Sequence, residues 1–344
     1  MAPRSGQGTF CSLPFPTVIS PGIDSTGHLG LCPSSTSFDE GWLPVSGGHH
    51  IHYTQRGSPD GIPAVVIHGG PGSGSSPQQA RFFDPARYRI IQFDQRGCGL
   101  SYPLGEIRDN STAQLLEDID LLRRHLAVSR WLVVGGSWGA TLGAVYAARY
   151  RSNVTGVVLR GLFLAGSDDI RWFFQNAASK FPDAWLSFAE GAPPDRRHDL
   201  LAWLHDVFTK GHENSQMHAA QRWFDWERTL SAVAPGQVPD AATRHALCQR
   251  YRVQSHYLAN QCWLGDTRVI EACASLSGFP VAFLHGEQDR VCRVKRARLA
   301  HKACAGSTFQ LAIGAGHDPF HPAMVDAMRR GLIGFSTRNS FLPP

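Results

Sequence analysis

Short apolar runs alternate with stretches of helical periodicity along most of the chain. Several of the runs are almost continuously apolar, which is typical of strands buried on both faces of a parallel sheet. The predicted strands cover residues 42–45, 51–55, 64–68, 89–93, 131–134, 154–160, 281–285 and 309–313. Residues 111–125 and 141–150 have the period of a helix, and in the first of them Leu115, Ile119 and Leu122 share one face.

The order of these elements predicts the fold class. Strands that alternate with helices favour an α/β domain with a mostly parallel sheet flanked by helices. We assign residues 37–164 and 276–344 to this core. The alternation stops over 165–275, where helical periodicity and six of the nine tryptophans predict an inserted helical cap. Residues 1–36 are rich in Ser, Pro, Gly and Thr and have no period, so we expect a flexible or surface-draped extension there.

The composition is that of a globular protein and narrows the choice of partners. With 42% hydrophobic and 18% charged residues, disordered, collagen-like and coiled-coil classes are excluded. The net charge of +5 is scattered without a basic run, so we expect neither a nucleic-acid partner nor a membrane surface. No apolar stretch approaches the roughly 18 residues that span a bilayer, and the first residues lack the apolar core of a signal peptide. A soluble, cytoplasmic protein is the expectation.

The cysteines give no sign of a disulfide framework or of a metal site. The chain has eight of them but no CxxC pair. We therefore expect free thiols in a reducing compartment and no bound metal.

A single G-x-S-x-G motif, residues 135–139, lies where a predicted buried strand meets a helix rich in small residues. This context is typical of a nucleophile elbow, in which glycines on both sides of the serine allow a tight, strained turn. The motif therefore predicts that Ser137 is a catalytic nucleophile. A chance match is the alternative, because the chain contains 35 glycines.

A serine nucleophile needs a base and an acid, which in such folds follow it in the order Asp or Glu, then His. Asp289 lies four residues beyond the predicted strand 281–285, and His317 lies four residues beyond 309–313. We predict these two as the acid and the base. Asp266 and Glu287 remain competitors for the acid.

The glycine-rich segment 68–72 directly follows the strand 64–68. Glycines there let a backbone N–H approach a developing oxyanion. We predict an oxyanion hole formed by the N–H groups of Gly70 and Trp138. A simple Gly/Pro turn without a catalytic role is the alternative.

Several longer motifs extend these features and carry a family resemblance. They are HGGPGSG (68–74), FDQRGCGLSYP (93–103), GGSWGATLGAVYA (135–147), WFDWE (223–227), GEQDRVC (286–292) and GAGHDPF (314–320). From about Phe38 to Phe335 the chain resembles the proline iminopeptidases of the α/β-hydrolase fold. The resemblance implies a serine peptidase that uses Ser137, Asp289 and His317, needs no metal or organic cofactor, and releases N-terminal proline from peptides.

The resemblance also implies a cap site for the free amine of the substrate, usually formed by two glutamates. One of them matches Glu227, whereas Gln254 stands at the other position and offers a neutral acceptor. One or two of Trp138, Trp223, Trp226 and Trp263 are expected to face a proline ring, and we select Trp223 and Trp226. Packing in the core is the alternative for these side chains. Without the resemblance, Glu227 would be interpreted as a solvated cap residue or as an ion-pair partner of a neighbouring arginine, Arg222 or Arg228.

Three functions remain open from the sequence. The leading hypothesis is a serine aminopeptidase acting on peptides with a free N-terminal proline. The replacement at Gln254 motivates the first alternative, a hydrolase of a small-molecule ester or amide, since this fold hosts many hydrolytic reactions. A non-catalytic binding protein on a hydrolase scaffold is the second alternative. The sequence makes no prediction of the oligomeric state.

Overall fold

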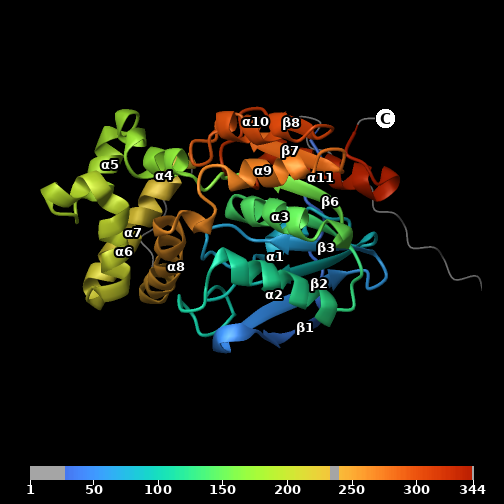
Figure 1. Ribbon diagram of the computed structural model, residues 1–344, viewed down its shortest axis with the longest axis horizontal. Coiled ribbons are helices and arrows are strands. Elements are labelled where there is room, and N and C mark those ends of the chain that lie inside the picture. Colours follow the sequence, from blue (N-terminus) through green and yellow to red (C-terminus); the bar gives the residue numbers. More distant parts are fainter. Residues whose placement is uncertain (1–27, 233–239, 343–344) are drawn as a thin grey trace, which may run out of the picture.

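A computed structural model describes residues 28–232 and 240–342, and an eight-stranded sheet lies at its centre (Figure 1). The strands are β1 (Ser37–Pro44), β2 (His50–Gly57), β3 (Ile62–Ile67), β4 (Tyr88–Phe93), β5 (Trp131–Gly136), β6 (Val154–Arg160), β7 (Val281–Gly286) and β8 (Thr308–Ala312). Their order across the sheet is β1-β2-β4-β3-β5-β6-β7-β8. The pairs β1–β2 and β2–β4 are antiparallel, and the pairs from β4 to β8 are parallel. The predicted fold class is confirmed.

Both faces of the sheet are buried, which explains the continuous apolar runs. In β3, Val65 and Ile67 belong to one core cluster, while Ala64 and Val66 belong to the other. The first face is covered by α2 (Thr112–His125), α3 (Trp138–Arg149), α9 (Arg268–Ser275) and α10 (Val294–Ala303). The second face is covered by α1 (Pro77–Ala80) and α11 (Pro322–Arg338). Side chains that alternate along a strand therefore meet helices on either side.

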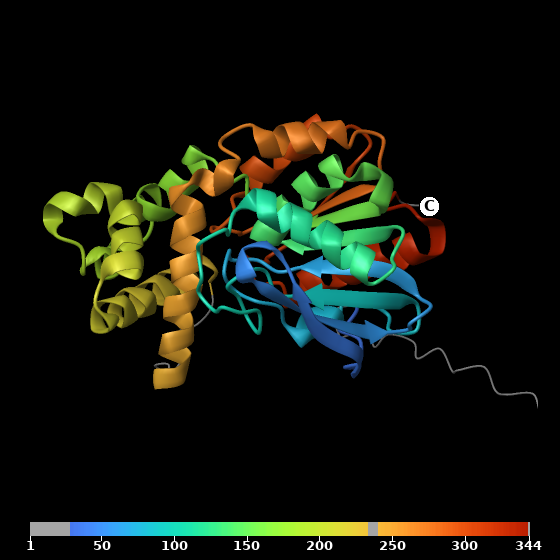
Figure 2. The same ribbon diagram turned by 60° about the horizontal axis from the view of Figure 1, so that its bottom comes forward.

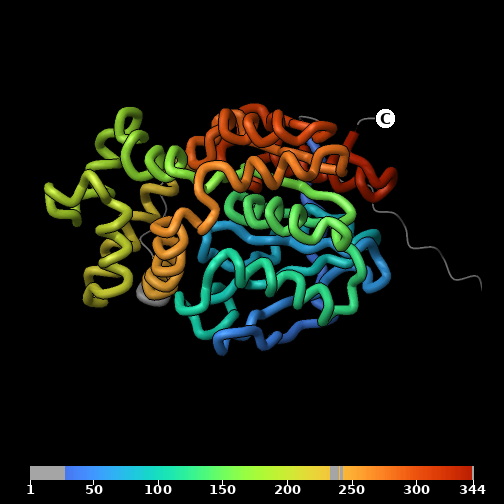
Figure 3. The backbone as a smooth tube through the Cα atoms, viewed as in Figure 1, coloured from blue at the N-terminus to red at the C-terminus, as the bar shows by residue number. Residues whose placement is uncertain are grey.

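Between β6 and β7 the chain leaves the sheet, forms a helical cap and returns (Figure 3). The cap helices are α4 (Ser167–Phe174), α5 (Pro182–Ala189), α6 (Leu200–Lys210), α7 (Glu213–Leu230) and α8 (Ala241–Ala259). Short 3-10 helices are η1 (Ser46–Gly48), η2 (Arg151–Asn153), η3 (Asn176–Ser179), η4 (Pro194–Asp199) and η5 (Gln261–Trp263). Helix α9 lies inside the range predicted for the cap, but it packs against α3 and α10 of the core.

Aromatic side chains form the interior of the cap. Trp223 of α7 stacks on Tyr251 of α8 with ring centroids 4.7 Å apart, and Trp226 stacks on Phe188 of α5 at 5.7 Å. All four rings are fully buried. Burial of such large rings is the main force that holds α5, α7 and α8 together.

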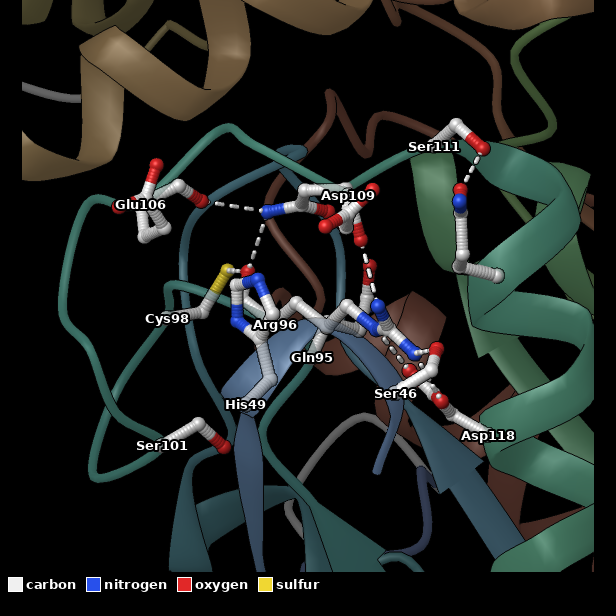
Figure 4. A network of polar contacts seen from close by, with 12 residues as sticks. Ser46, His49, Gln95, Arg96, Cys98, Ser101, Glu106, Asp109, Ser111 and Asp118 are labelled. Atoms are coloured by element: carbon white, nitrogen blue, oxygen red, sulfur yellow. Dashed lines mark hydrogen bonds and ion pairs between the residues drawn. The ribbon is translucent and has the colours of Figure 1, made fainter. Parts of the chain in front are cut away.

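Arg96 organises the loop that follows β4 (Figure 4). Its guanidinium donates two hydrogen bonds to Asp118 of α2, at 2.6 and 2.7 Å, one to Ser46 Oγ at 2.9 Å, and one to the carbonyl of Asp109. The side chains of Arg96 and Asp118 are only 1% and 3% exposed. A bidentate pair of this kind fixes both the position and the orientation of the guanidinium relative to α2.

The same loop anchors the cap through α8. Asn110 Nδ2 donates to the carbonyl of Arg96 at 3.0 Å, and Asn110 Oδ1 accepts a hydrogen bond from the hydroxyl of Tyr257 at 2.7 Å. Figure 2 shows α8 between the other cap helices and the core. The position of α8 relative to the sheet therefore depends on this chain of polar contacts.

Residues 28–36 lie on the surface of the core. The N–H of Leu29 donates to Asp326 of α11 at 2.9 Å, and the N–H of Cys32 donates to the carbonyl of Arg81 at 2.8 Å. The rest of the predicted extension, residues 1–27, lies outside the described residues. Seven cysteines are described and all are free and buried, as expected; Cys11 lies outside the described part.

Within the described ranges, no helix combines the length and apolar character that crossing a membrane requires.

We predict that Asp118→Asn lowers the free energy of unfolding by about 3–5 kcal/mol, because it leaves the Arg96 charge buried without a carboxylate. Arg124→Gln is the control, since this arginine pairs with Asp120 at the surface and its side chain is 61% exposed. The control should change stability by less than about 1 kcal/mol. Urea unfolding measures both. Equal shifts of the two midpoints would contradict a structural role for the Arg96 pair.

Candidate active site

Ser137 occupies a tight turn between β5 and α3. Its backbone has φ 56° and ψ −123°, a region that residues with a side chain rarely adopt. The turn requires glycine at two flanking positions. A Cβ on Gly135 would lie 2.1 Å from the carbonyl oxygen of Gly139, and one on Gly139 would lie 2.1 Å from that of Ile67. The sequence motif therefore has the elbow geometry that it predicts.

The two other predicted catalytic side chains lie in contact. Asp289 follows β7 and His317 follows β8, and His317 Nδ1 is 2.7 Å from Asp289 Oδ2. The other oxygen, Asp289 Oδ1, accepts hydrogen bonds from the N–H groups of Val291 and Cys292 at 3.0 and 2.8 Å. The carboxylate is thus held from one side and faces the imidazole with the other.

The electrostatics of Asp289 favour its ionised form. Burial alone would raise the pKa of this carboxyl, but the charge and hydrogen bond of His317 and the N–H of Cys292 together hold the pKa below its usual range. His285 lies 3.6 Å from the same oxygen, and burial lowers the pKa of that imidazole. His317, at 2.7 Å, is therefore the closer of the two histidines to this carboxylate.

Ser137 and His317 face one cavity without a direct hydrogen bond between them. Hydrogen bonds of this kind are often long in free enzymes and tighten when substrate binds. The polar contact of the Ser137 hydroxyl is with the thiol of Cys292, at 3.9 Å. Burial raises the pKa of that thiol well above its usual value, so it stays protonated and does not compete as a nucleophile.

Asp266 and Glu287, the competitors for the acid, lie elsewhere. Asp266 accepts a hydrogen bond from the N–H of Ser167 at 2.6 Å, and Glu287 accepts one from the N–H of Gly314 at 3.1 Å. The geometry therefore favours Asp289 as the residue that orients His317.

The segment with the predicted oxyanion donor lies beside the nucleophile. Gly69 and Gly70 line the cavity, and a Cβ on Gly69 would lie 3.3 Å from Cβ of Ser137. Trp138 is the first residue of α3, where a backbone N–H has no partner within the helix. Both predicted donors thus lie next to Ser137 in space or along the chain.

Gln95 links the two segments that carry these donors, a role that the sequence analysis missed. Its Nε2 donates to the carbonyl of His68 at 2.9 Å, and its Oε1 accepts from Nε1 of Trp138 at 2.9 Å. The backbone N–H of Gln95 also donates to Nε2 of His68. The FDQRGCG motif was the available signal, but it does not reveal these partners.

Arg160, at the end of β6, was also missed. Its backbone carbonyl accepts the N–H of Ser137 at 2.8 Å, and its guanidinium donates to the carbonyl of His317 at 2.9 Å. A single residue therefore contacts both the predicted nucleophile and the predicted base.

The cavity beside Ser137 has a volume of about 260 Å³ and lies between the core and the cap. Its apolar lining comes from both parts and is formed by Phe163, Ile170, Phe173, Phe174, Leu258, Val291 and Pro319. Its polar lining includes Gln79, Arg160, Asp169, Glu227, Arg250 and Gln254. An apolar pocket with a few polar groups is the usual form of a small-ligand site.

Glu227 lies in this lining and accepts three hydrogen bonds. Arg250 Nη2 donates to its Oε2 at 2.6 Å, as does the hydroxyl of Tyr251 at 3.0 Å. Gln254 Nε2 donates to its Oε1 at 2.8 Å. The ion-pair partner of Glu227 is therefore Arg250, a residue that the sequence analysis did not select, while Arg222 pairs with Glu190.

Gln254 lines the cavity as well and is only 5% exposed. Its Oε1 is buried and has no hydrogen-bond partner. A buried polar atom without a partner is costly and needs an explanation. A ligand donor in the cavity would supply one.

Trp223 and Trp226 are not among the described residues that line the cavity. Both are buried in the aromatic interior of the cap, and Trp226 Nε1 donates to the carbonyl of Phe173 at 3.1 Å. Phe173 and Phe174 lie in front of them and form the wall. The expectation that the two tryptophans face a proline ring therefore needs correction, because cap packing places phenylalanines there.

Among residues 28–232 and 240–342, no three His, Cys, Asp or Glu side chains cluster so that they could hold a metal ion. The absence of a cofactor stays a prediction.

Comparisons with known proteins agree with this geometry. The family model described as the alpha/beta hydrolase fold matches residues 63–323. The proline iminopeptidase of Xylella fastidiosa (strain Temecula1 / ATCC 700964) is 37% identical over 302 residues, which are 87% of this chain and 96% of the relative. The proline iminopeptidase of Xanthomonas citri is 37% identical over 310 residues, covering 89% and 99% of the two chains.

Solved structures show the same fold at lower identity. The proline iminopeptidase-related protein from Thermus thermophilus has a TM-score of 0.57 at 20% identity, covering 88% of this chain and 99% of that one. The esterase RhEst1 from Rhodococcus sp. ECU1013 has a TM-score of 0.54 at 20% identity, covering 87% and 98%. With the family model and the relatives above, the chain belongs to the α/β-hydrolase fold family and, within it, to the proline iminopeptidases.

Proposed function

We propose that this protein is a serine aminopeptidase that releases N-terminal proline from peptides through an acyl-enzyme. One observation carries the proposal: a single cavity contains Ser137 and His317 and also the acceptor groups of Glu227 and Gln254. A nucleophile and an amine site in one small cavity suit a substrate cleaved after its first residue. Membership of the proline iminopeptidases supports the same reading.

In the proposed mechanism, Ser137 Oγ attacks the carbonyl carbon of the prolyl residue while His317 Nε2 takes the hydroxyl proton. Asp289 holds the Nδ1–H of His317 and stabilises the imidazolium. The N–H groups of Gly70 and Trp138 donate to the oxyanion. The C–N bond then breaks, His317 protonates the leaving amine, and water hydrolyses the acyl-enzyme by the same route.

Glu227 and Gln254 have two acceptor positions left for the substrate. A carboxylate has about four acceptor sites, and three of those on Glu227 are used. One remains on Oε1, beside the partnerless Oε1 of Gln254. The protonated nitrogen of an N-terminal proline has two N–H groups, which match this number. A primary ammonium has three, so its third N–H would need an acceptor other than these two residues.

A second candidate, hydrolysis of a small ester or amide without a free amine, is favoured by the neutral acceptor at Gln254. The two candidates differ in whether the substrate must carry a protonated nitrogen. A comparison of free and blocked substrates therefore separates them.

We predict that the purified protein hydrolyses prolyl arylamide faster than alanyl arylamide and much faster than N-blocked prolyl arylamide. Ser137→Ala should lower kcat/KM by about 10⁴- to 10⁶-fold, because the triad acts as one unit. Steady-state kinetics on this panel, with a simple aryl ester added, gives the values. Equal rates for free and blocked prolyl substrates would favour the second candidate. Residual activity above about a tenth in Ser137→Ala would exclude this nucleophile.

Asp289→Asn should lower kcat by about 10⁴-fold, because the amide would stabilise the wrong tautomer of His317. Glu287→Gln and Asp266→Asn are the matched controls, since neither contacts the imidazole, and each should retain most activity. The kcat values are measured with prolyl arylamide on folded protein, checked by circular dichroism. A large loss in either control with little loss in Asp289→Asn would mean that the acid is misassigned.

Gln254→Glu should raise kcat/KM for prolyl arylamide about 10-fold, because a charged acceptor binds an ammonium more strongly than a neutral one. The same variant should leave the aryl ester unaffected, since that substrate has no amine. Glu227→Gln should abolish the preference for proline. Kinetics with both substrates measures the effects. Unchanged or slower prolyl turnover in Gln254→Glu would argue against Gln254 as an amine contact.

A further inference from the structure

We propose that Arg250 is a specificity-determining residue of the amine site, where its charge opposes that of the substrate ammonium and weakens the binding of free amines. The inference rests on the proposed function, because it concerns the same site.

The contact between Arg250 and Glu227 is close. Arg250 Nη2 lies 2.6 Å from Glu227 Oε2, and the guanidinium lies over the ring of Tyr251 at 5.1 Å from its centroid. Burial alone would lower the pKa of Arg250, but the Glu227 carboxylate raises it, so the guanidinium stays charged. An ammonium that approaches Glu227 therefore meets a cation already in place.

The backbone of Arg250 is fixed as well. Its carbonyl packs against Gly72 so closely that a Cβ on this glycine would lie 2.4 Å from the carbonyl oxygen. Gly72 belongs to the same glycine-rich segment as the predicted oxyanion donor Gly70. The base of the Arg250 side chain is thus tied to the catalytic edge of the core, so the arginine cannot withdraw with a simple shift of α8.

Each acidic residue that lines the cavity in the described part of the chain is already paired with arginine. Of the acidic residues that line it in the described ranges, Glu227 contacts Arg250, and Asp169 contacts Arg293 and Arg296 at 3.0 and 3.3 Å. Arg160 adds a further guanidinium to the lining. No net negative charge is therefore left to attract an ammonium.

Two routes to amine binding follow, and both are opposed by Arg250. The ammonium can share Glu227 with the guanidinium, and then two like charges lie close together in a partly desolvated cavity. It can instead displace the guanidinium, which then loses its carboxylate while still partly buried. Removal of the charge should therefore tighten amine binding.

Pyrrolidine tests the effect of Arg250 on amine binding directly. It is a protonated secondary amine at neutral pH and has no ester or amide bond that the enzyme could hydrolyse. Its inhibition constant is measured against hydrolysis of a simple aryl ester in the wild type and in Arg250→Met, which keeps an apolar stem over Tyr251. We expect the inhibition constant to fall about 10-fold. Cyclopentanol, a neutral ring of similar size, should bind equally to both proteins.

Arg252→Met is the matched control. It removes the same charge from the same helix, but two residues correspond to about 200° around the helix, and Arg252 is not among the lining residues. The inhibition constant for pyrrolidine should stay within about 2-fold of the wild type. A similar decrease in both variants would show a general charge effect and would overturn the proposal.

A second variant, Arg250→Ala, tests the same proposal independently of Arg250→Met. In Arg250→Ala, added guanidinium ion should occupy the vacated position and raise the inhibition constant of pyrrolidine again, while sodium chloride at equal ionic strength should not. An inhibition constant does not depend on the fraction of folded enzyme, so partial unfolding does not imitate the result. If Arg250→Met and Arg250→Ala bind pyrrolidine as weakly as the wild type or more weakly, Arg250 orients Glu227 and the proposal is wrong.

The test of Arg250 can fail independently of the test of the proposed aminopeptidase activity. The inhibition constants are obtained without turnover of a prolyl substrate. A wild type that leaves prolyl arylamide intact would exclude the aminopeptidase proposal, whereas an unchanged pyrrolidine constant in the variants would exclude only the role of Arg250.

Discussion

The contacts of Arg160 are the constraint on which the catalytic geometry depends. Its carbonyl holds the N–H of Ser137 in the strained turn, and its guanidinium holds the carbonyl of His317. Strand β6, which ends at Arg160, pairs with β5 on one side and β7 on the other. The proposed nucleophile and the proposed base come from segments far apart in sequence, so their alignment depends on the ends of the parallel strands and on this one residue.

The fold and the positions of the three proposed catalytic residues were predictable because their signals are local. Strands buried on both faces leave continuous apolar runs, and the spacing of Asp289 and His317 after two such runs follows from the sheet edge itself. The elbow is also local, since Gly135 and Gly139 are dictated by backbone contacts within a few residues of Ser137 and with β3. In these cases the contact that requires a residue type involves residues near it in the chain or in the adjacent strand, so the sequence pattern reveals it.

The proposed amine site was less predictable because it is formed between cap helices. Trp223, Trp226 and Glu227 fall on one stripe of α7, yet packing against α5 and α8 buries the two rings and leaves the carboxylate at the cavity. The pairing of Glu227 with Arg250 joins residues 23 positions apart on different helices. Neither the hydrophobic period of the helices nor a sequence motif indicates this pairing. Such contacts depend on how helices cross, which a single sequence does not specify.

The closeness of the two ends of the cap has a consequence for the evolution of substrate choice. The N–H of Ser167, at the start of α4, donates to Asp266, which follows the last helices of the cap, at 2.6 Å. The chain therefore enters and leaves the cap at neighbouring points. Because the ends of the insertion are already close, a change in its length adds little loop-closure entropy and leaves the strands in place. The catalytic edge can therefore be inherited unchanged while the insertion is lengthened, shortened or replaced, and lineages can acquire new substrates without rebuilding the machinery that cleaves them.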